Sequence, residues 1–317
     1  MPSPHAPRRG TLQFWPRVRA KREVARVRRW AAVKDTKLLG FLGYKAGMCH
    51  VIAIDNRPKS LSKGEEIALP ATIIECPAMK VAGVNFYRHK DGASQLISTF
   101  FSPDVKDLSR LLPLSKKPAK TLQDIKEFDD LKILVHTQPR QTGIGTKKPK
   151  LVEIAIGGNK DEKMKYAVEK LGKEITVEEV FKEGNQVDVH AITKGKGFQG
   201  PVKRHGVMIR HHKSEKARRA NVRGSWTGPK MWTAPHSGGM GYHQRVDRNK
   251  IILKIGKEPK EINPAGGLIK YGVIKNHFLL VKGSLPGARK RVVTLTQPTR
   301  ADPNLPKEAP NVKTVIV

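Results

Sequence analysis

"KLLGFLGYKAGMCHVIAID", residues 37–55, is the stretch that decides the fold. It holds two apolar segments separated by a glycine-containing segment, and short apolar runs bounded by turn residues predict β-strands. We therefore expect two strands that pair across a glycine-rich turn at this point of the chain.

Similar runs follow further along the chain. ALPATIIECPAMKVAGVNFY (68–87) predicts two more strands. Four later runs, each bounded by Gly or Pro, predict one strand each: NQVDVHAITKG (185–195), NKIILKIG (249–256), GVIKNHFLLVKG (272–283) and KRVVTLTQP (290–298). Because these runs are short and rich in Val and Ile, they favour a closed antiparallel barrel over a sheet of βαβ units.

Helical patterns concentrate between residues 104 and 181. NKDEKMKYAVEKLG (159–172) places Met164, Val168 and Leu171 on one face of a helix. TVEEVF (176–181) contains a capping box, in which Thr176 and Glu179 satisfy each other's backbone donors. These patterns predict a small α/β insertion.

The expected fold is mainly β with an α/β insertion: a closed antiparallel β-barrel core with a long basic finger and an amino-terminal extension. Five parts follow from the patterns and the charge: a basic amino-terminal extension (1–35), the barrel core (36–90 and 181–298), the insertion (91–180), a basic tryptophan finger within the barrel domain (201–250) and an extended tail (299–317).

The charge balance indicates a polyanionic partner. The chain has 61 Lys and Arg against 28 Asp and Glu, a formal net charge of +33. The excess is concentrated in residues 1–30 and 203–250, whereas residues 121–190 are close to neutral. Self-repulsion of this size disfavours a free protein. Nucleic acid is the first candidate partner and an anionic membrane the second, but no apolar run approaches the roughly 20 residues that span a bilayer.

The remaining motifs argue against an enzyme. GKGFQG (195–200) matches a dinucleotide-binding pattern, but Pro201 follows it where a helix would be needed, so a glycine hinge is the better interpretation. We expect Cys49 and Cys76 to be buried and reduced, and His136 and His190 to be core histidines with satisfied ring nitrogens. No spacing predicts a metal site, a cofactor or a catalytic residue.

The finger contains "RGSWTGPKMW", residues 223–232, whose glycines and cations flank two tryptophans. Trp226 has few apolar neighbours in sequence, which favours stacking on unpaired bases. Trp232 either stacks in the same way or belongs to a small local core, in which Met231, Trp232 and Met240 pack on each other or on the barrel. For Trp15 and Trp30, in the amino-terminal extension, the sequence does not distinguish base stacking from packing within the protein.

Longer motifs carry a family resemblance. They include APRRGTLQFWPRVRA (6–20), FLGYKAGM (41–48), VHTQPR (135–140), AITKGKGFQGPVKRHG (191–206), GSWTGPKMWTAPHSGGMGYHQR (224–245) and NPAGGLIKYGVIKNHFLLVKGSLPGARKRVVTL (263–295). Together they resemble the universal large-subunit ribosomal protein three family. The amino-terminal motif resembles archaeal and eukaryotic members, and the short tail resembles archaeal ones. Cys49 stands where a threonine is more usual.

The resemblance implies a structural constituent of the cytoplasmic large ribosomal subunit that binds 23S-type ribosomal RNA beside other ribosomal proteins and supports assembly. It implies a finger whose tip, Trp226, approaches the peptidyl-transferase centre. No cofactor, membrane contact or homo-oligomer is expected. The expected RNA-binding residues are Arg8, Arg9, Arg17, Arg19, Lys203, Arg204, His205, Arg210, His211, His212, Lys213, Arg218, Arg219, Arg223, Trp226, Lys230, His236, His243 and Arg245.

Two other functions are compatible with part of the pattern. A DNA- or chromatin-binding module would account for the charge, but it would present a recognition helix or a minor-groove arm to a duplex. An RNA-modifying enzyme would need a cofactor loop or a catalytic dyad. The glycine-rich, aromatic finger favours irregular, partly single-stranded RNA over either alternative.

Overall fold

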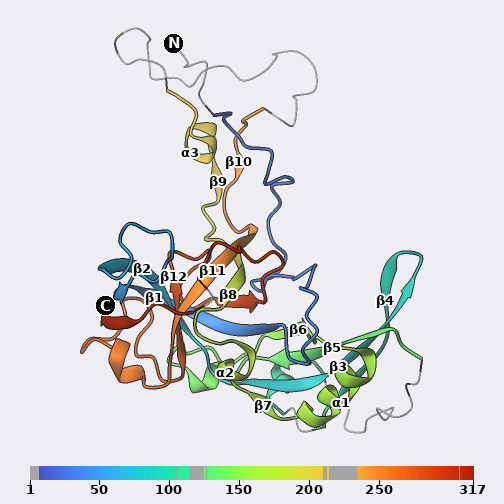
Figure 1. The fold of residues 1–317 in the computed structure, drawn as a ribbon. Helices are drawn as coiled ribbons and strands as arrows, with labels where there is room; N and C mark the ends of the chain where they lie inside the picture. Colours follow the sequence, from blue (N-terminus) through green and yellow to red (C-terminus); the bar gives the residue numbers. More distant parts are fainter. Residues whose placement is uncertain are drawn as a thin grey trace, which may run out of the picture. The chain divides into compact units, whose positions relative to one another are not determined.

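In the computed structural model, the described residues are 7–103, 106–113, 125, 127–209, 213, 234–306 and 308–317. The chain forms two compact units. One, here called the arm unit, comprises Met1–Arg22 and Ile192–Gln244; the other, here called the body, comprises Glu23–Ala191 and Arg245–Val317. The fold is mainly β with antiparallel sheets, as predicted (Figure 1).

The larger sheet has seven strands. They are β1 (Gly40–Ile54), β2 (Glu66–Glu75), β8 (Gln186–Ile192), β11 (Gln244–Gly256), β12 (Phe278–Lys282), β13 (Val292–Thr296) and β14 (Val312–Ile316). Their order is β13-β8-β11-β12-β2-β1-β14, and β13 also pairs with β1. The strands predicted downstream of residue 180 are confirmed as β8, β11, β12 and β13. The tail that was predicted to be extended ends in β14.

The stretch at residues 37–55 differs from the prediction in one respect. Gly40–Ile54 is a single strand of 15 residues, so the expected turn within it is wrong. Its glycines allow close approach instead: a Cβ on Gly43 would lie 2.4 Å from Ile74 Cγ2, and one on Gly40 would lie 2.8 Å from the Leu295 carbonyl oxygen. A glycine in a strand marks a close contact as often as a turn, and the sequence does not distinguish the two.

A second sheet holds five strands: β3 (Met79–Lys90), β4 (Ala93–Phe101), β5 (Asp130–His136), β6 (Leu151–Ala155) and β7 (Glu174–Ile175). The order is β4-β3-β5-β6, with β7 beside β3. Asp91 and Gly92 connect β3 to β4 with φ of 52° and 72°. An Asp-Gly pair with positive φ at both positions is typical of a two-residue hairpin turn.

The helices are short. They are α1 (Lys160–Lys170), α2 (Val177–Val180) and α3 (Pro201–His205), with 3-10 turns η1 (Lys106–Arg110), η3 (Pro139–Gln141) and η5 (Pro259–Ile262). The predicted capping box is confirmed, because the Glu179 carboxylate accepts a 3.0 Å hydrogen bond from the Thr176 amide. The predicted apolar face of α1 is only partly correct: Met164 and Leu171 pack on the core, whereas Val168 is 53% exposed and Ala167 is buried.

The cysteines and core histidines are buried, as expected. Burial raises the pKa of Cys49 to about 11, and it also raises the pKa of Cys76. Burial lowers the pKa of His136 and of His190. The His136 Nδ1 lies 3.1 Å from the Thr137 carbonyl, but within the described part of the chain His136 Nε2 and His190 Nδ1 have no hydrogen-bond partner. The expectation that both rings are fully satisfied is therefore wrong.

The packing at Gly43 generates a prediction about stability. In Gly43→Ala the new methyl group would overlap Ile74, a buried branched side chain, so the strands must separate or Ile74 must leave its rotamer. Overpacking of this kind costs about 1–3 kcal/mol in the free energy of unfolding. Denaturant unfolding of the purified chain measures this loss. Gly266→Ala is the control, because a Cβ there meets nothing within 4 Å; equal stability of the two variants would contradict the argument.

Candidate nucleic-acid interface

The basic segment begins at a narrow two-stranded ribbon in the arm unit. β9 (Phe198–Gln199) pairs with β10 (Gly238–Gly239), with Gln199 opposite Gly238. Hydrogen bonds extend the pairing beyond these residues: Lys196 N donates to Met240 O and Met240 N to Gly197 O, both at 2.9 Å, and Tyr242 N donates to Lys194 O at 3.3 Å. Residues 194–199 and 238–242 are called the ribbon below (Figure 1).

A glycine is required in the ribbon. Gly241 has φ of +77°, and a Cβ there would lie 1.9 Å from the Lys194 carbonyl oxygen. Gly197 also has a positive φ, so the GKGFQG segment does hold conformations that other residues avoid. It does not act as a loose hinge, however, because its backbone is paired with the opposite strand of the ribbon.

A short helix follows the ribbon, where none was expected. α3 begins at Pro201, with Gly200 as its N-cap and Gly206 in the left-handed conformation at its end. Proline is favourable at the first helical position, since its missing N–H would have no intrahelical partner there. A helix of five residues is too short to provide the dipole on which a dinucleotide site depends. GKGFQG therefore remains a poor match to a dinucleotide-binding loop, although a helix follows it.

Arg204 fastens α3 to the opposite strand. Its guanidinium donates hydrogen bonds to the carbonyl oxygens of His236, at 2.9 Å, and Gly239, at 3.1 Å. The two segments that enter and leave the basic finger are thereby held together. Charge-assisted hydrogen bonds are the strong ones, and this pair fixes the spacing at the base of the finger.

The amino-terminal extension joins the ribbon. The Ala20 amide donates to Tyr242 O at 2.8 Å, and His243 Nδ1 lies 2.8 Å from Val18 O. The Arg19 guanidinium carbon is 5.5 Å from the centre of the Tyr242 ring, a cation–π distance. The two basic segments found in the sequence, more than 200 residues apart, therefore form one structure (Figure 1).

The predicted RNA-binding residues divide by exposure. Arg8, Arg9, Arg19, Lys203 and Lys213 are exposed, while Arg17, Arg204, His205, His236 and Arg245 are half-buried. His243 is only 9% exposed and connects the ribbon to the extension, so its side chain is placed to brace the arm unit. Arg210, His211, His212, Arg218, Arg219, Arg223, Trp226 and Lys230 lie outside the described residues, as does Trp232.

Apolar side chains add to this surface. Phe198, on β9, is 77% exposed, and Met208 and Ile209 beyond α3 are 55% and 49% exposed. Phe198 was not among the residues predicted to bind RNA, although, like Trp226, it lies between glycines in a basic segment. Of the two undecided tryptophans, Trp30 packs on the core of the body, whereas Trp15 is 46% exposed and lies 6.0 Å from the Arg17 guanidinium.

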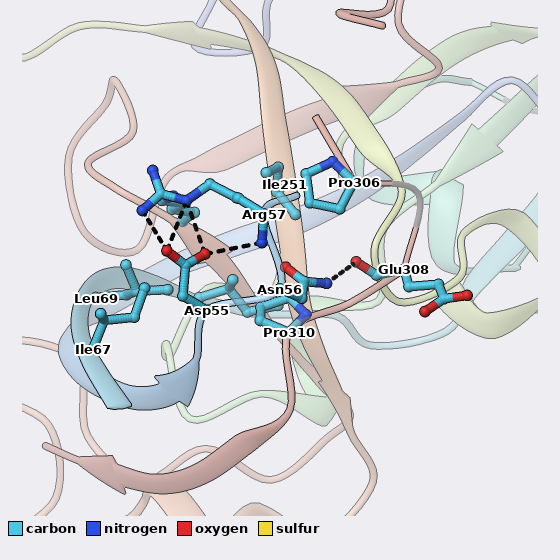
Figure 2. A pocket seen from close by; sticks show the side chains of 11 residues that line it. Asp55, Asn56, Arg57, Ile67, Leu69, Ile251, Pro306, Glu308 and Pro310 are labelled. Atoms are coloured by element: carbon cyan, nitrogen blue, oxygen red, sulfur yellow. Dashed lines mark hydrogen bonds and ion pairs between the residues drawn. The ribbon is translucent and has the colours of Figure 1, made fainter. Parts of the chain in front are cut away.

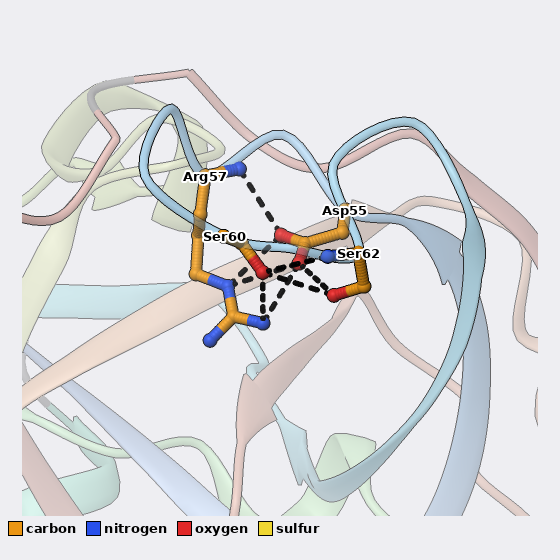
Figure 3. Close-up of polar contacts among 4 residues, drawn as sticks. All are labelled: Asp55, Arg57, Ser60 and Ser62. Atoms are coloured by element: carbon orange, nitrogen blue, oxygen red, sulfur yellow. Dashed lines mark hydrogen bonds and ion pairs between the residues drawn. The ribbon is translucent and has the colours of Figure 1, made fainter.

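The body has a small pocket beside Asp55 (Figure 2). Its volume of about 20 Å³ has room for about one water molecule. The Asp55 carboxylate accepts hydrogen bonds from the Arg57 amide at 3.0 Å, from the Arg57 guanidinium at 2.7 Å and from Ser62 Oγ at 2.8 Å (Figure 3). These donors lower the pKa of Asp55, and the carboxylate organises its own loop.

Metal binding and membrane crossing concern the same described residues. They contain no group of three or more His, Cys, Asp or Glu side chains that could hold a metal ion. None of their helices is long and apolar enough to cross a membrane.

Exposed cations on a paired ribbon, such as Lys194 and Lys196, are a feature expected of a structural nucleic-acid-binding protein. The comparisons with known proteins specify the class. A family model described as ribosomal protein L3 matches residues 1–314, and the chain belongs to this family. The family is one of structural proteins of the large ribosomal subunit, not of enzymes, and ribosomal RNA binding is general within it.

Archaeal relatives agree with this assignment. The chain is 45% identical over 306 residues to the large ribosomal subunit protein uL3 of Archaeoglobus fulgidus, covering 93% of this chain and 92% of the relative. It is 44% identical over 301 residues to the uL3 protein of Methanococcus vannielii, covering 91% and 90%. It is 40% identical over 326 residues to that of Methanopyrus kandleri, covering 98% and 90%.

The role of Arg204 in the ribbon can be tested by hydrogen exchange. Arg204→Ala removes both hydrogen bonds to the opposite strand, and the amides of Lys196 and Met240 should then exchange more than tenfold faster, because each bond to a charged group contributes about 1.5–3 kcal/mol. Lys203→Ala is the control: it removes an exposed cation from the same helix and should leave these amides protected. Similar exchange in both variants would show that Arg204 does not hold the ribbon.

Proposed function

We propose that the arm unit holds large-subunit ribosomal RNA through its cations and directs the basic finger toward the peptidyl-transferase centre. The single observation that carries this proposal is the joining of the two basic segments at the ribbon. The arrangement places cations from residues 8–19 and from residue 203 onward in one unit with few acidic groups. Phosphates that enter such a surface release condensed counterions, which drives binding.

The body is the rigid base of this device. We propose that six of its strands close into a barrel, since the pairings run from β1 through β2, β12, β11, β8 and β13, and β13 pairs again with β1. A closed set of strands has no free edge and resists shear. In the sequence, the arm unit joins the body after Arg22, before Ile192 and after Gln244.

Trp226 is proposed as the finger tip. This assignment comes from the motif GSWTGPKMW and its resemblance to the family, because the residue lies outside the described part of the chain. Peptide-bond formation belongs to the RNA, and the protein supports its geometry. By neutralising phosphates on adjacent RNA helices, the protein allows those helices to approach, which also gives it a role in assembly beside neighbouring ribosomal proteins.

A duplex DNA-binding module remains the alternative that the charge alone would allow. The described structure gives it little support, because the cation-rich arm unit contains only a five-residue helix and a short ribbon among its described residues. Competition between structured large-subunit RNA and duplex DNA separates the two, with the RNA expected to bind more tightly at equal salt.

The electrostatic basis of binding predicts a steep salt dependence. The affinity of the full chain for large-subunit RNA should fall linearly on a log–log plot against salt, by about 0.7–0.9 per phosphate contact. The triple variant Arg8→Gln, Arg9→Gln and Lys203→Gln removes three cations of the arm unit and should reduce the magnitude of the slope by about 2–3. Filter binding over a range of salt concentrations measures both slopes.

A charge-matched control accompanies this triple variant. Lys59→Gln, Lys63→Gln and Lys90→Gln remove three exposed cations from the body, two in a loop and one at the end of β3. Nucleotides that the arm unit protects from hydroxyl radicals should lose protection in the first triple and keep it in the second. Binding insensitive to salt, or equal loss in both variants, would refute an interface centred on the arm unit.

The finger tip is tested by Trp226→Ala. The free energy of unfolding of the isolated chain should stay nearly unchanged, while ribosomes that carry the variant should show altered aminoacyl-tRNA accommodation or altered response to drugs of the catalytic centre. Trp30→Ala is the contrasting variant, since its ring packs on the core and its loss should destabilise the body. Marked unfolding of Trp226→Ala would show that its ring packs within the protein instead.

A further inference from the structure

The loop between β5 and β6, residues 137–150, has a fixed shape despite its length. Thr137 N donates to Lys150 O at 3.1 Å, and Lys150 N donates to Thr137 Oγ1, also at 3.1 Å, which closes the loop at its base. Tyr44 OH adds a 2.9 Å hydrogen bond to Thr137 Oγ1. Hairpin loops usually have about 2–5 residues, so a loop of this length often carries a function of its own.

Further contacts hold the middle of the loop on the body. Thr142 Oγ1 donates to Pro139 O at 2.7 Å, and Asn276 Nδ2 donates to Gln141 O at 3.1 Å. Thr142 is 6% exposed, and Ile144 packs against the main core. The side chains of this loop are therefore presented from an ordered backbone, which reduces the entropy lost when a ligand binds.

A pocket of about 320 Å³ opens beside this loop. Arg140 and Lys147 line it from the loop, and Arg110 lines it from the end of η1. The position of Arg110 is set by Leu108, which is fully buried in a small apolar cluster beneath η1. Thr146 adds a hydroxyl group, and Gly145 leaves its backbone open, since a Cβ there would meet nothing within 4 Å.

The pocket carries a net positive charge. One of its three cations is paired with a carboxylate: Asp107 Oδ1 lies 3.2 Å from an Arg140 guanidinium nitrogen. Both members of this pair are about half exposed, at 56% for Arg140 and 46% for Asp107, so the ion pair is weak and can be displaced. None of the residues that line the pocket is acidic.

We propose that this pocket binds a phosphodiester group of large-subunit ribosomal RNA and is a contact separate from the arm unit. Guanidinium groups match phosphate oxygens in pairs, and a lysine and a hydroxyl complete the set of donors. An acidic protein segment fits the pocket less well. Protein interfaces depend on buried apolar or aromatic anchors, and the lining offers Arg, Lys, Thr, Gly and one already buried proline.

The sequence conceals this site. Residues 121–190 hold nearly equal numbers of acidic and basic residues, so the region has no net charge signal. The fold brings Arg110, from outside this range, to the same pocket as Arg140 and Lys147. Some acidic residues of the range form ion pairs elsewhere, such as Lys163–Asp130 and Lys170–Glu179. A local positive site thus forms where a nearly neutral segment meets Arg110.

The test maps the RNA next to the pocket. Thr146→Cys places a single exposed thiol on it, because the native cysteines are 4% and 3% exposed and resist labelling. An iron chelate attached to this thiol, on the full chain bound to purified large-subunit RNA, should cleave one discrete RNA segment. The triple variant Arg110→Gln, Arg140→Gln and Lys147→Gln should lose hydroxyl-radical protection of that segment and keep the protection given by the arm unit.

A second variant tests the sign of the effect. Asp107→Asn removes the competing carboxylate, so protection of the same segment should persist to higher salt than in the wild type. A merely structural role for the Asp107–Arg140 pair predicts equal or weaker protection. Arg110→Lys with Arg140→Lys keeps the charge but loses the paired geometry, and it should retain only part of the protection.

The inference rests on the proposed RNA binding, and the outcomes separate the two. If the wild-type chain shows no salt-dependent RNA binding, the proposed function fails. If it binds RNA but the chelate at residue 146 cleaves none, or the triple variant keeps all protection, only the pocket proposal is overturned. A photo-cross-linker at residue 146 that captures a protein instead of RNA in assembled subunits would also overturn it.

Discussion

The pairing of β1 on both edges is the constraint on which the body depends. This strand pairs with β2 from Tyr44 to Ile54, with β13 from Gly40 to Tyr44 and with β14 from His50 to Ala53. Strands can approach it this closely because Gly40 and Gly43 lack side chains at the tightest contacts. Its backbone groups are thus largely satisfied, and the apolar residues of neighbouring strands meet over it in one core.

The arm unit is stabilised by other interactions than the body. Among its described residues, a few specific hydrogen bonds, such as those of Arg204 and His243, hold the backbone segments together, and none of these residues belongs to the two apolar cores. These bonds use some polar groups internally and leave other cations exposed to solvent. A surface of this kind is held in shape by the protein and completed electrostatically by a polyanion. Division of labour between a packed body and a polar arm suits a protein that must both fold and interlock with RNA.

Much of this could be predicted from residue patterns, and the failures have physical reasons. Apolar runs identified β2, β8, β12 and β13 because burial imposes composition on strands. Glycine misled the prediction within Gly40–Ile54, since it serves turns and close contacts alike. Val168 was misassigned because Ala167, a small residue, fills the buried side of α1. The contact between Val18 and His243 was beyond reach, because no local pattern records a partner so distant in sequence.

That last contact bears on how the chain is made. Val18 and His243 are 225 residues apart in the sequence, and the separation of Ala20 from its partner Tyr242 is similar. At about 5–20 residues per second, the amino-terminal segment is synthesised on the order of 10–45 s before its docking site exists. During that interval its cations face the cell without their intramolecular partner. The amino-terminal segment of the arm unit can therefore reach its final structure only after the residues that follow Ala191 have been made.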